Sequence, residues 1–185
     1  MAGLARTNGG GWRGSPWRIA LWGVPALLLL VPAVAMRFTD EVKWDGADFA
    51  AMAILLFTAA GAFDLAARAT LSWAYRAAAA VAVTASFLIV WINLAVGMIG
   101  PEDDPYNLLF GGAIAVALIG AMLARFRPAG MARAMLAAGA WQAAVAAAGL
   151  TADWRGGVST LVLAGLWLVA AGLFLRAGRQ EAGAG

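Results

Sequence analysis

Most of the side chains that carry enzyme chemistry are missing from this sequence. The 185 residues include no Cys and no His, which excludes thiolate nucleophiles, disulfides, Cys/His zinc sites and His-ligated haem. The single lysine, Lys43, lies in a polar segment, so a Schiff-base lysine inside an apolar segment is excluded as well. Neither a Gly-rich phosphate loop nor a serine nucleophile elbow is present. The residues therefore predict a non-enzymatic protein.

A first group of polar side chains lies inside long apolar runs. The group consists of Thr58, Asp64, Arg68, Thr84, Ser86, Asn93 and Gln142. Asp64 and Arg68 have the i, i+4 spacing of an intrahelical ion pair, and the alternative is a proton or cation relay through Asp64. We expect Gln142 to hydrogen-bond between helices, the alternative being a small polar pocket that it forms with Thr58, Thr84 and Ser86.

A second group is acidic and lies in the polar connections. It consists of Asp40, Glu41, Asp45, Asp48, Glu102, Asp103, Asp104 and Asp153. Asp45 or Asp48 is expected to cap the helix that follows. Solvation of short loops explains the group as a whole. Two alternatives are a hard cation such as Ca²⁺ held by Glu102, Asp103 and Asp104 with Asn107, and a basic partner protein; no calcium-loop spacing is present.

The elements that position both groups are membrane-spanning helices. Hydrophobic residues make up 63% of the chain and charged residues 12%, whereas soluble domains are about 25% charged. Because a spanning helix takes about 20 apolar residues, we predict an all-α polytopic bundle with six spans, over residues 19–36, 47–66, 77–99, 108–124, 131–150 and 158–175. Residues 1–18 are expected to form a disordered basic tail and residues 176–185 a polar tail.

The distribution of basic residues predicts the orientation. The N-terminal tail, the even-numbered connections and the C-terminal tail hold ten arginines, namely Arg6, Arg13, Arg18, Arg68, Arg76, Arg125, Arg127, Arg133, Arg176 and Arg179. The other connections hold Arg37, Lys43 and Arg155. The positive-inside rule then places both termini in the cytoplasm, in a bacterial inner membrane. The first span also resembles a secretory signal with Ala33-Val34-Ala35 as a cleavage-like site, and we expect it to stay attached.

Small and aromatic residues predict how the helices pack. Lipid tails are as apolar as leucine, so helices associate where small side chains let them approach closely. The predicted contact positions are Gly112, Gly120, Ala137, Ala138, Gly139, Ala140, Ala144, Ala147, Gly165 and Gly172. The alanine-rich fifth span is expected to be central. Most tryptophans, including Trp17, Trp44 and Trp167, are expected in interfacial belts.

Some segments resemble an uncharacterised family of small multipass bacterial inner-membrane proteins. The resemblance rests on Phe38-Thr39-Asp40-Glu41-Val42 with Trp44, on Tyr75-Arg76, on Leu94-Ala95-Val96-Gly97 and on Ala124-Arg125-Phe126-Arg127-Pro128. It implies a multipass membrane fold and carries no catalytic or binding residues over to this chain.

The functional expectation is a small accessory or scaffold subunit that packs against a larger membrane complex. The alternative is a small cation- or proton-coupled transporter or channel. The expected partners are the lipid bilayer and a larger membrane complex or further copies of the chain, and not nucleic acid. No cofactor is predicted; a quinone, a pigment or a surface cation are the alternatives weighed.

Overall fold

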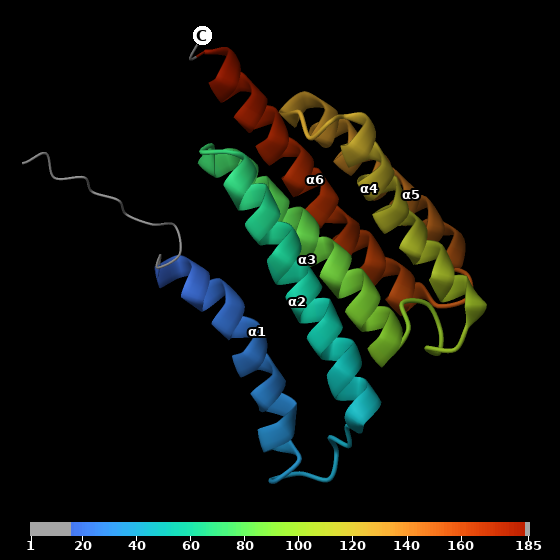
Figure 1. The fold of residues 1–185 in the computed structure, drawn as a ribbon. Helices are drawn as coiled ribbons and strands as arrows, with labels where there is room; N and C mark the ends of the chain where they lie inside the picture. Colours follow the sequence, from blue (N-terminus) through green and yellow to red (C-terminus); the bar gives the residue numbers. More distant parts are fainter. Residues whose placement is uncertain (1–15, 184–185) are drawn as a thin grey trace, which may run out of the picture. The chain divides into compact units, whose positions relative to one another are not determined.

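The chain is an all-α, multipass membrane protein. A computed structural model describes residues 16–183, so most of the predicted basic tail lies outside the described residues. The described helices are α1 (Pro16–Ala35), α2 (Gly46–Ala69), α3 (Trp73–Ala95), the 3₁₀ helix η2 (Pro105–Phe110), α4 (Gly111–Leu123), α5 (Pro128–Gly149) and α6 (Trp154–Ala182) (Figure 1). The predicted fold class is confirmed.

Within residues 16–183, five helical stretches are long and apolar enough to cross a membrane. They are Trp17–Ala35, Gly46–Ala69, Trp73–Ala95, Pro105–Leu123 and Trp154–Ala182. The fifth predicted span, residues 131–150, corresponds to α5, which has 22 residues but is less apolar because alanine, glycine, Arg133 and Gln142 replace leucine-type side chains. A helix of this composition gains less from facing lipid than the other five do.

The chain divides into two compact units, residues 1–60 and residues 61–185. In the first unit, Trp22 of α1 stacks on Phe57 of α2 with ring centroids 6.2 Å apart. The Asp45 carboxylate accepts hydrogen bonds from the N–H groups of Ala47 and Asp48, at 2.7 and 3.0 Å, and Asp48 accepts one from Asp45 N–H at 2.9 Å. The predicted cap of α2 is confirmed, and both carboxylates take part in it.

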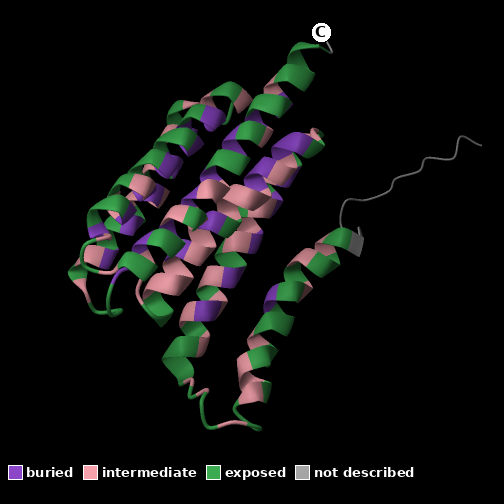
Figure 2. Cartoon of the chain, turned by 180° about the vertical axis from the view of Figure 1, so that it is seen from behind, coloured by how far each residue is buried: buried purple, intermediate pink, exposed green. Residues whose placement is uncertain are grey.

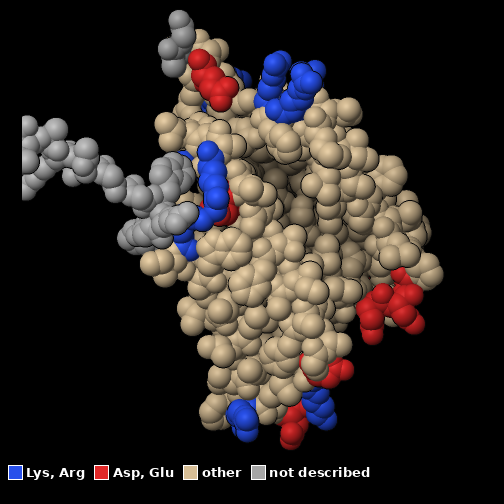
Figure 3. Space-filling model, viewed as in Figure 1, with Lys and Arg blue, Asp and Glu red and all other residues tan. Residues whose placement is uncertain are grey.

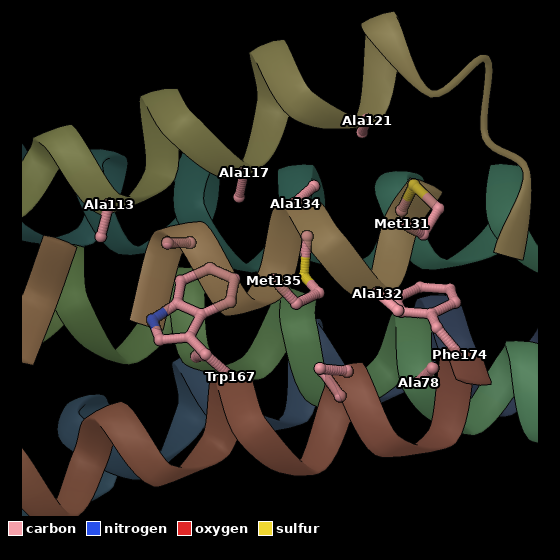
Figure 4. Packing of buried hydrophobic residues seen from close by; sticks show 14 of the residues in the cluster. Ala78, Ala113, Ala117, Ala121, Met131, Ala132, Ala134, Met135, Trp167 and Phe174 are labelled. Atoms are coloured by element: carbon pink, nitrogen blue, oxygen red, sulfur yellow. The ribbon is translucent and has the colours of Figure 1, made fainter. Parts of the chain in front are cut away.

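The second unit contains α3, α4, α5 and α6. α5 packs against α4 on one side and α6 on the other, and α3 packs against α6. Alanines and a few large side chains fill the core, with Trp167 and Phe174 of α6 and Met135 of α5 among them (Figure 4). Trp167 is completely buried, so its expected place in an interfacial belt is wrong.

A tight connection joins α3 to η2 at the end of the unit that the orientation predicts to be periplasmic, called the outer end below. The Asn107 amide oxygen accepts hydrogen bonds from the N–H groups of Met98 and Ile99, at 3.0 and 2.9 Å, and its nitrogen donates to Pro101 O at 2.8 Å. Gly97 has a φ of +75°, and a Cβ there would lie 2.6 Å from Gly100 O. The Asn107 side chain therefore pairs the backbone N–H groups that follow α3, where the hydrogen bonds of the helix have ended.

Glycine contacts agree with the packing prediction in α4 and α5 and disagree in α6. A Cβ on Gly112 would meet the Trp141 ring at 2.4 Å, one on Gly120 would meet Ala134 at 2.5 Å, and one on Gly139 would meet Trp167 at 3.0 Å. Nothing lies within 4 Å of the corresponding position on Gly165 or Gly172. The prediction that these two glycines mark helix contacts is therefore wrong for the described residues, because both face open space.

Several helix ends differ from the predicted spans by a few residues, and the start of α3 and the end of α6 have a clear cause or consequence. α3 begins at Trp73, four residues before the predicted start, because the Ser72 hydroxyl accepts a hydrogen bond from Tyr75 N–H and caps the helix. α6 continues to Ala182 through most of the predicted polar tail, and Ser72 Oγ donates to Gln180 Oε1 at 3.3 Å.

Candidate functional site

Gln142 forms the one polar network that the described structure buries completely between two helices. Its Nε2 donates to Thr160 O of α6 at 3.2 Å, and its Oε1 accepts from Trp167 Nε1 at 2.7 Å. Gln142 and Trp167 both have no exposed surface. The predicted hydrogen bonding of Gln142 between helices is confirmed, and its partner Trp167 was not foreseen because an indole at that position also fits an interfacial belt.

Asp64 and Arg68 form the predicted i, i+4 ion pair within α2. The Asp64 side chain is 4% exposed and that of Arg68 is 47% exposed. The carboxylate is therefore buried while the guanidinium reaches the surface, as a long basic side chain near a helix end does in a membrane.

The remaining polar residues of the apolar segments lie apart from the Gln142 network. Thr58 of α2 and Thr84 of α3 are exposed, and Thr58 belongs to the first unit. Ser86 Oγ donates to Ala82 O at 3.0 Å, and Asn93 Nδ2 donates to Ile89 O at 2.7 Å. Both bonds return to the backbone of α3, so the donors of these side chains are paired within their own helix, whereas the buried Asn93 Oδ1 has no hydrogen-bond partner among the described residues.

Several of the acidic residues cap helices. Asp104 Oδ1 accepts from Tyr106 N–H at 2.8 Å at the start of η2. Asp153 accepts from the N–H groups of Arg155 and Gly156 at the start of α6, and from Gly100 N–H of the α3–η2 connection. The hydrogen bonds from Gly156 and Gly100 hold the pKa of Asp153 below its usual value. A carboxylate at a helix N-terminus is stabilised by free N–H groups and by the helix dipole.

An open pocket of about 250 Å³ lies beside Glu102, Asp103 and Asp104. Asn93, Leu94, Pro105, Asn107 and Leu108 complete its lining. Among residues 16–183, no three carboxylates come close enough together to hold a metal ion. The acidic residues between positions 40 and 48 belong to the first unit. Asp153 caps the N-terminus of α6.

A row of exposed alanines runs along α5, and we call it the alanine stripe. Its members are Ala137, Ala140, Ala144 and Ala147, all exposed. The opposite face of α5 holds Ala138, Gln142 and Ala146, each with no exposed surface. Figure 2 shows this alternation of buried and exposed colour along the helices of the second unit. The alanines expected to pack within the chain therefore lie on a free face, with Ala138 as the exception.

Comparison with models of known families, with curated proteins and with solved structures gave no match.

Proposed function

We propose that the protein is a non-enzymatic accessory or scaffold subunit of a larger membrane complex, and that the alanine stripe of α5 is its docking surface. The charge distribution supports a bacterial inner membrane with both termini in the cytoplasm. The observation that carries the proposal is the exposure of the stripe on α5, the one long described helix that is not among the five stretches apolar enough to cross a membrane.

The composition of α5 supports a helix partner for the stripe. Alanine offers lipid little apolar surface, whereas it allows a second helix to approach closely and gain contacts along the backbone. Ala140 and Ala144 have the small-xxx-small spacing of such contacts, and Ala147 and Ala137 extend the same face. A neighbouring helix would therefore cover α5 better than lipid chains would.

The polar groups of the spans support a structural role over transport. Gln142 and Trp167 satisfy one another, Ser86 and Asn93 bond to their own helix, and Asp64 is paired with Arg68. A transport pathway requires polar groups that line a continuous water-accessible path through the membrane. For this reason we place a cation- or proton-coupled transporter second.

The proposal is tested by photo-crosslinking in the native membrane. A photoreactive amino acid replaces Ala144 of the stripe, and the matched control replaces Ala115, an exposed alanine of α4. We expect position 144 to give one discrete adduct with a larger membrane protein, and position 115 to give lipid adducts only.

Three results would count against the assignment. Equal protein adducts from positions 144 and 115 would show random collision. An adduct of position 144 with the chain's own α1 or α2 would show that the stripe is covered internally. A dimer of the chain in place of a heteromeric adduct would make the protein a homo-oligomer.

A further inference from the structure

A hollow opens between α3 and α4 in the second unit. α3 packs on α6 and α4 packs on α5, whereas α3 and α4 approach each other at few points. Figure 3 shows the resulting hollow over α6, with uncharged walls. At the end opposite the outer end, called the inner end, Tyr75 Oη donates to Phe126 O at 2.9 Å and ties the start of α3 to the α4–α5 turn.

The walls of the hollow are uncharged along the length of both helices. α4 has no charged residue, and α3 has none after Arg76. Gly112 and Gly120 turn one face of α4 toward α5, where they contact Trp141 and Ala134. At 100° per residue, the opposite face of α4 holds Ile114 and Leu118. Leu118 is 60% exposed, so apolar surface remains open on this side.

The inner end of the hollow is basic. Figure 3 shows a group of Lys and Arg side chains above the hollow, at the α4–α5 turn. This turn contains Arg125 and Arg127, both exposed. Among the described residues neither forms a salt bridge, and the carboxylates of Glu102, Asp103 and Asp104 lie at the other end of the unit. An anion at the inner end would meet two guanidinium groups that have no competing partner.

We propose that the hollow binds one anionic phospholipid, with an acyl chain between α3 and α4 and the headgroup phosphate on Arg125 and Arg127. The two parts of the site match the two parts of such a lipid, because a guanidinium binds phosphate through paired hydrogen bonds and an uncharged slot accepts a hydrocarbon chain. The orientation predicted from the arginines places this turn in the cytoplasmic leaflet, where anionic lipids concentrate. The site lies away from the alanine stripe and does not depend on the proposed partner.

Native mass spectrometry of the full chain in mild detergent tests the site. The probes are phosphatidylglycerol and phosphatidylcholine with identical acyl chains. We expect one phosphatidylglycerol to bind at least about tenfold more tightly than phosphatidylcholine, since each arginine near a headgroup contributes roughly a factor of five. Arg125→Gln with Arg127→Gln should abolish this preference, while the charge-matched pair Arg37→Gln with Arg155→Gln should keep it.

A second pair of variants tests the acyl chain independently of the arginines. Leu118→Trp enlarges a side chain on the face of α4 along which the proposal places the acyl chain, and it should weaken phosphatidylglycerol binding about tenfold. Ile119→Trp, one residue further and 100° around the helix, should leave binding unchanged. Both positions are exposed, so both variants are expected to fold.

Four results would overturn the proposal. Equal binding of phosphatidylglycerol and phosphatidylcholine would contradict it, and so would a preference for phosphatidylglycerol that survives loss of both arginines. Equal effects of Leu118→Trp and Ile119→Trp would show that the acyl chain does not lie between α3 and α4. Displacement of the lipid by soluble glycerol phosphate at millimolar concentration would make the site one for free phosphate esters.

Discussion

Gln142 shows how this chain accommodates a polar side chain inside an apolar bundle. The amide uses one donor and one acceptor on α6, and the indole of Trp167 uses its only donor on the same amide. A buried polar group without a partner costs more than its hydrogen bond contributes. The pair therefore holds α5 and α6 together. Either side chain without the other would leave a buried polar group without a hydrogen-bond partner.

The pair predicts strong coupling in a double-mutant cycle. Gln142→Leu should lower the free energy of unfolding by about 1–3 kcal/mol, because it leaves the Trp167 N–H buried and unpaired. Trp167→Phe removes that N–H, and adding Gln142→Leu to it should cost about 1 kcal/mol less than in the wild type. Reversible unfolding in detergent and denaturant measures all four chains. Additive effects would show that the hydrogen bond contributes nothing.

Several roles of single residues could be predicted from the sequence, and others could not. The Asp64–Arg68 pair follows from an i, i+4 spacing that is local to one helix. The contact of Gln142 with Trp167 joins residues 25 positions apart, and the spacing contains no signal for it. Asn107 was weighed as a cation ligand, yet it holds the α3–η2 connection. This structural role belongs to a tight connection in which Gly97 has a positive φ. The residue types and spacing do not reveal that backbone conformation.

At the scale of the helices, the acidity of the connections that are predicted to be periplasmic has a physical origin in the topology. α2, η2 and α6 all begin at connections predicted to be periplasmic, and their N-termini are capped by Asp45, Asp104 and Asp153. Each cap is stabilised by free N–H groups and the helix dipole. Helix caps thus account for part of the acidity that the sequence also allowed to be a cation site.

The Asp153 cap predicts a loss of stability in acid. Because folding lowers the pKa of Asp153, its contribution is fully present above the ordinary value of 3.8 and is lost as the pH falls through the lower folded pKa. Asp153→Asn should weaken the bonds to Gly156 and Gly100 and remove this part of the pH dependence. Thermal unfolding between pH 2.5 and 6 measures the effect.

Asp103→Asn is the matched control for the cap. Asp103 lies in the acidic segment of the same outer end but caps no helix. Its substitution should leave the acid dependence close to that of the wild type. Identical profiles for the Asp153→Asn variant and the wild type would contradict the role of the cap.

The helices themselves were largely predictable because apolar length fixes a spanning helix. Their faces were less predictable. In an alanine-rich helix every face carries small residues, so the sequence cannot separate the face that packs on α6 from the exposed stripe of Ala137, Ala140, Ala144 and Ala147. Gly165 and Gly172 illustrate the same limit, since both were expected at contacts and both face open space.

At the scale of the molecule, the second unit combines an interior whose buried side-chain donors are paired, although the buried Asn93 Oδ1 has no hydrogen-bond partner within residues 16–183, with an exposed face suited to another helix. Gln142, Ser86 and Asn93 donate hydrogen bonds to backbone oxygens of the protein. Few side-chain donors therefore remain to line a pathway for a solute. The alanine stripe offers close packing and little apolar surface for lipid. Together these features favour a component of an assembly over a protein that works alone.

Native mass spectrometry of the chain, gently extracted from its own membrane, tests this account most directly. The account predicts a complex of fixed stoichiometry with at least one larger membrane protein. It further predicts that Ala140→Leu with Ala144→Leu releases the chain from the complex, while Ala115→Leu does not. A wild-type chain that emerges alone, or bound only to copies of itself, would contradict the account.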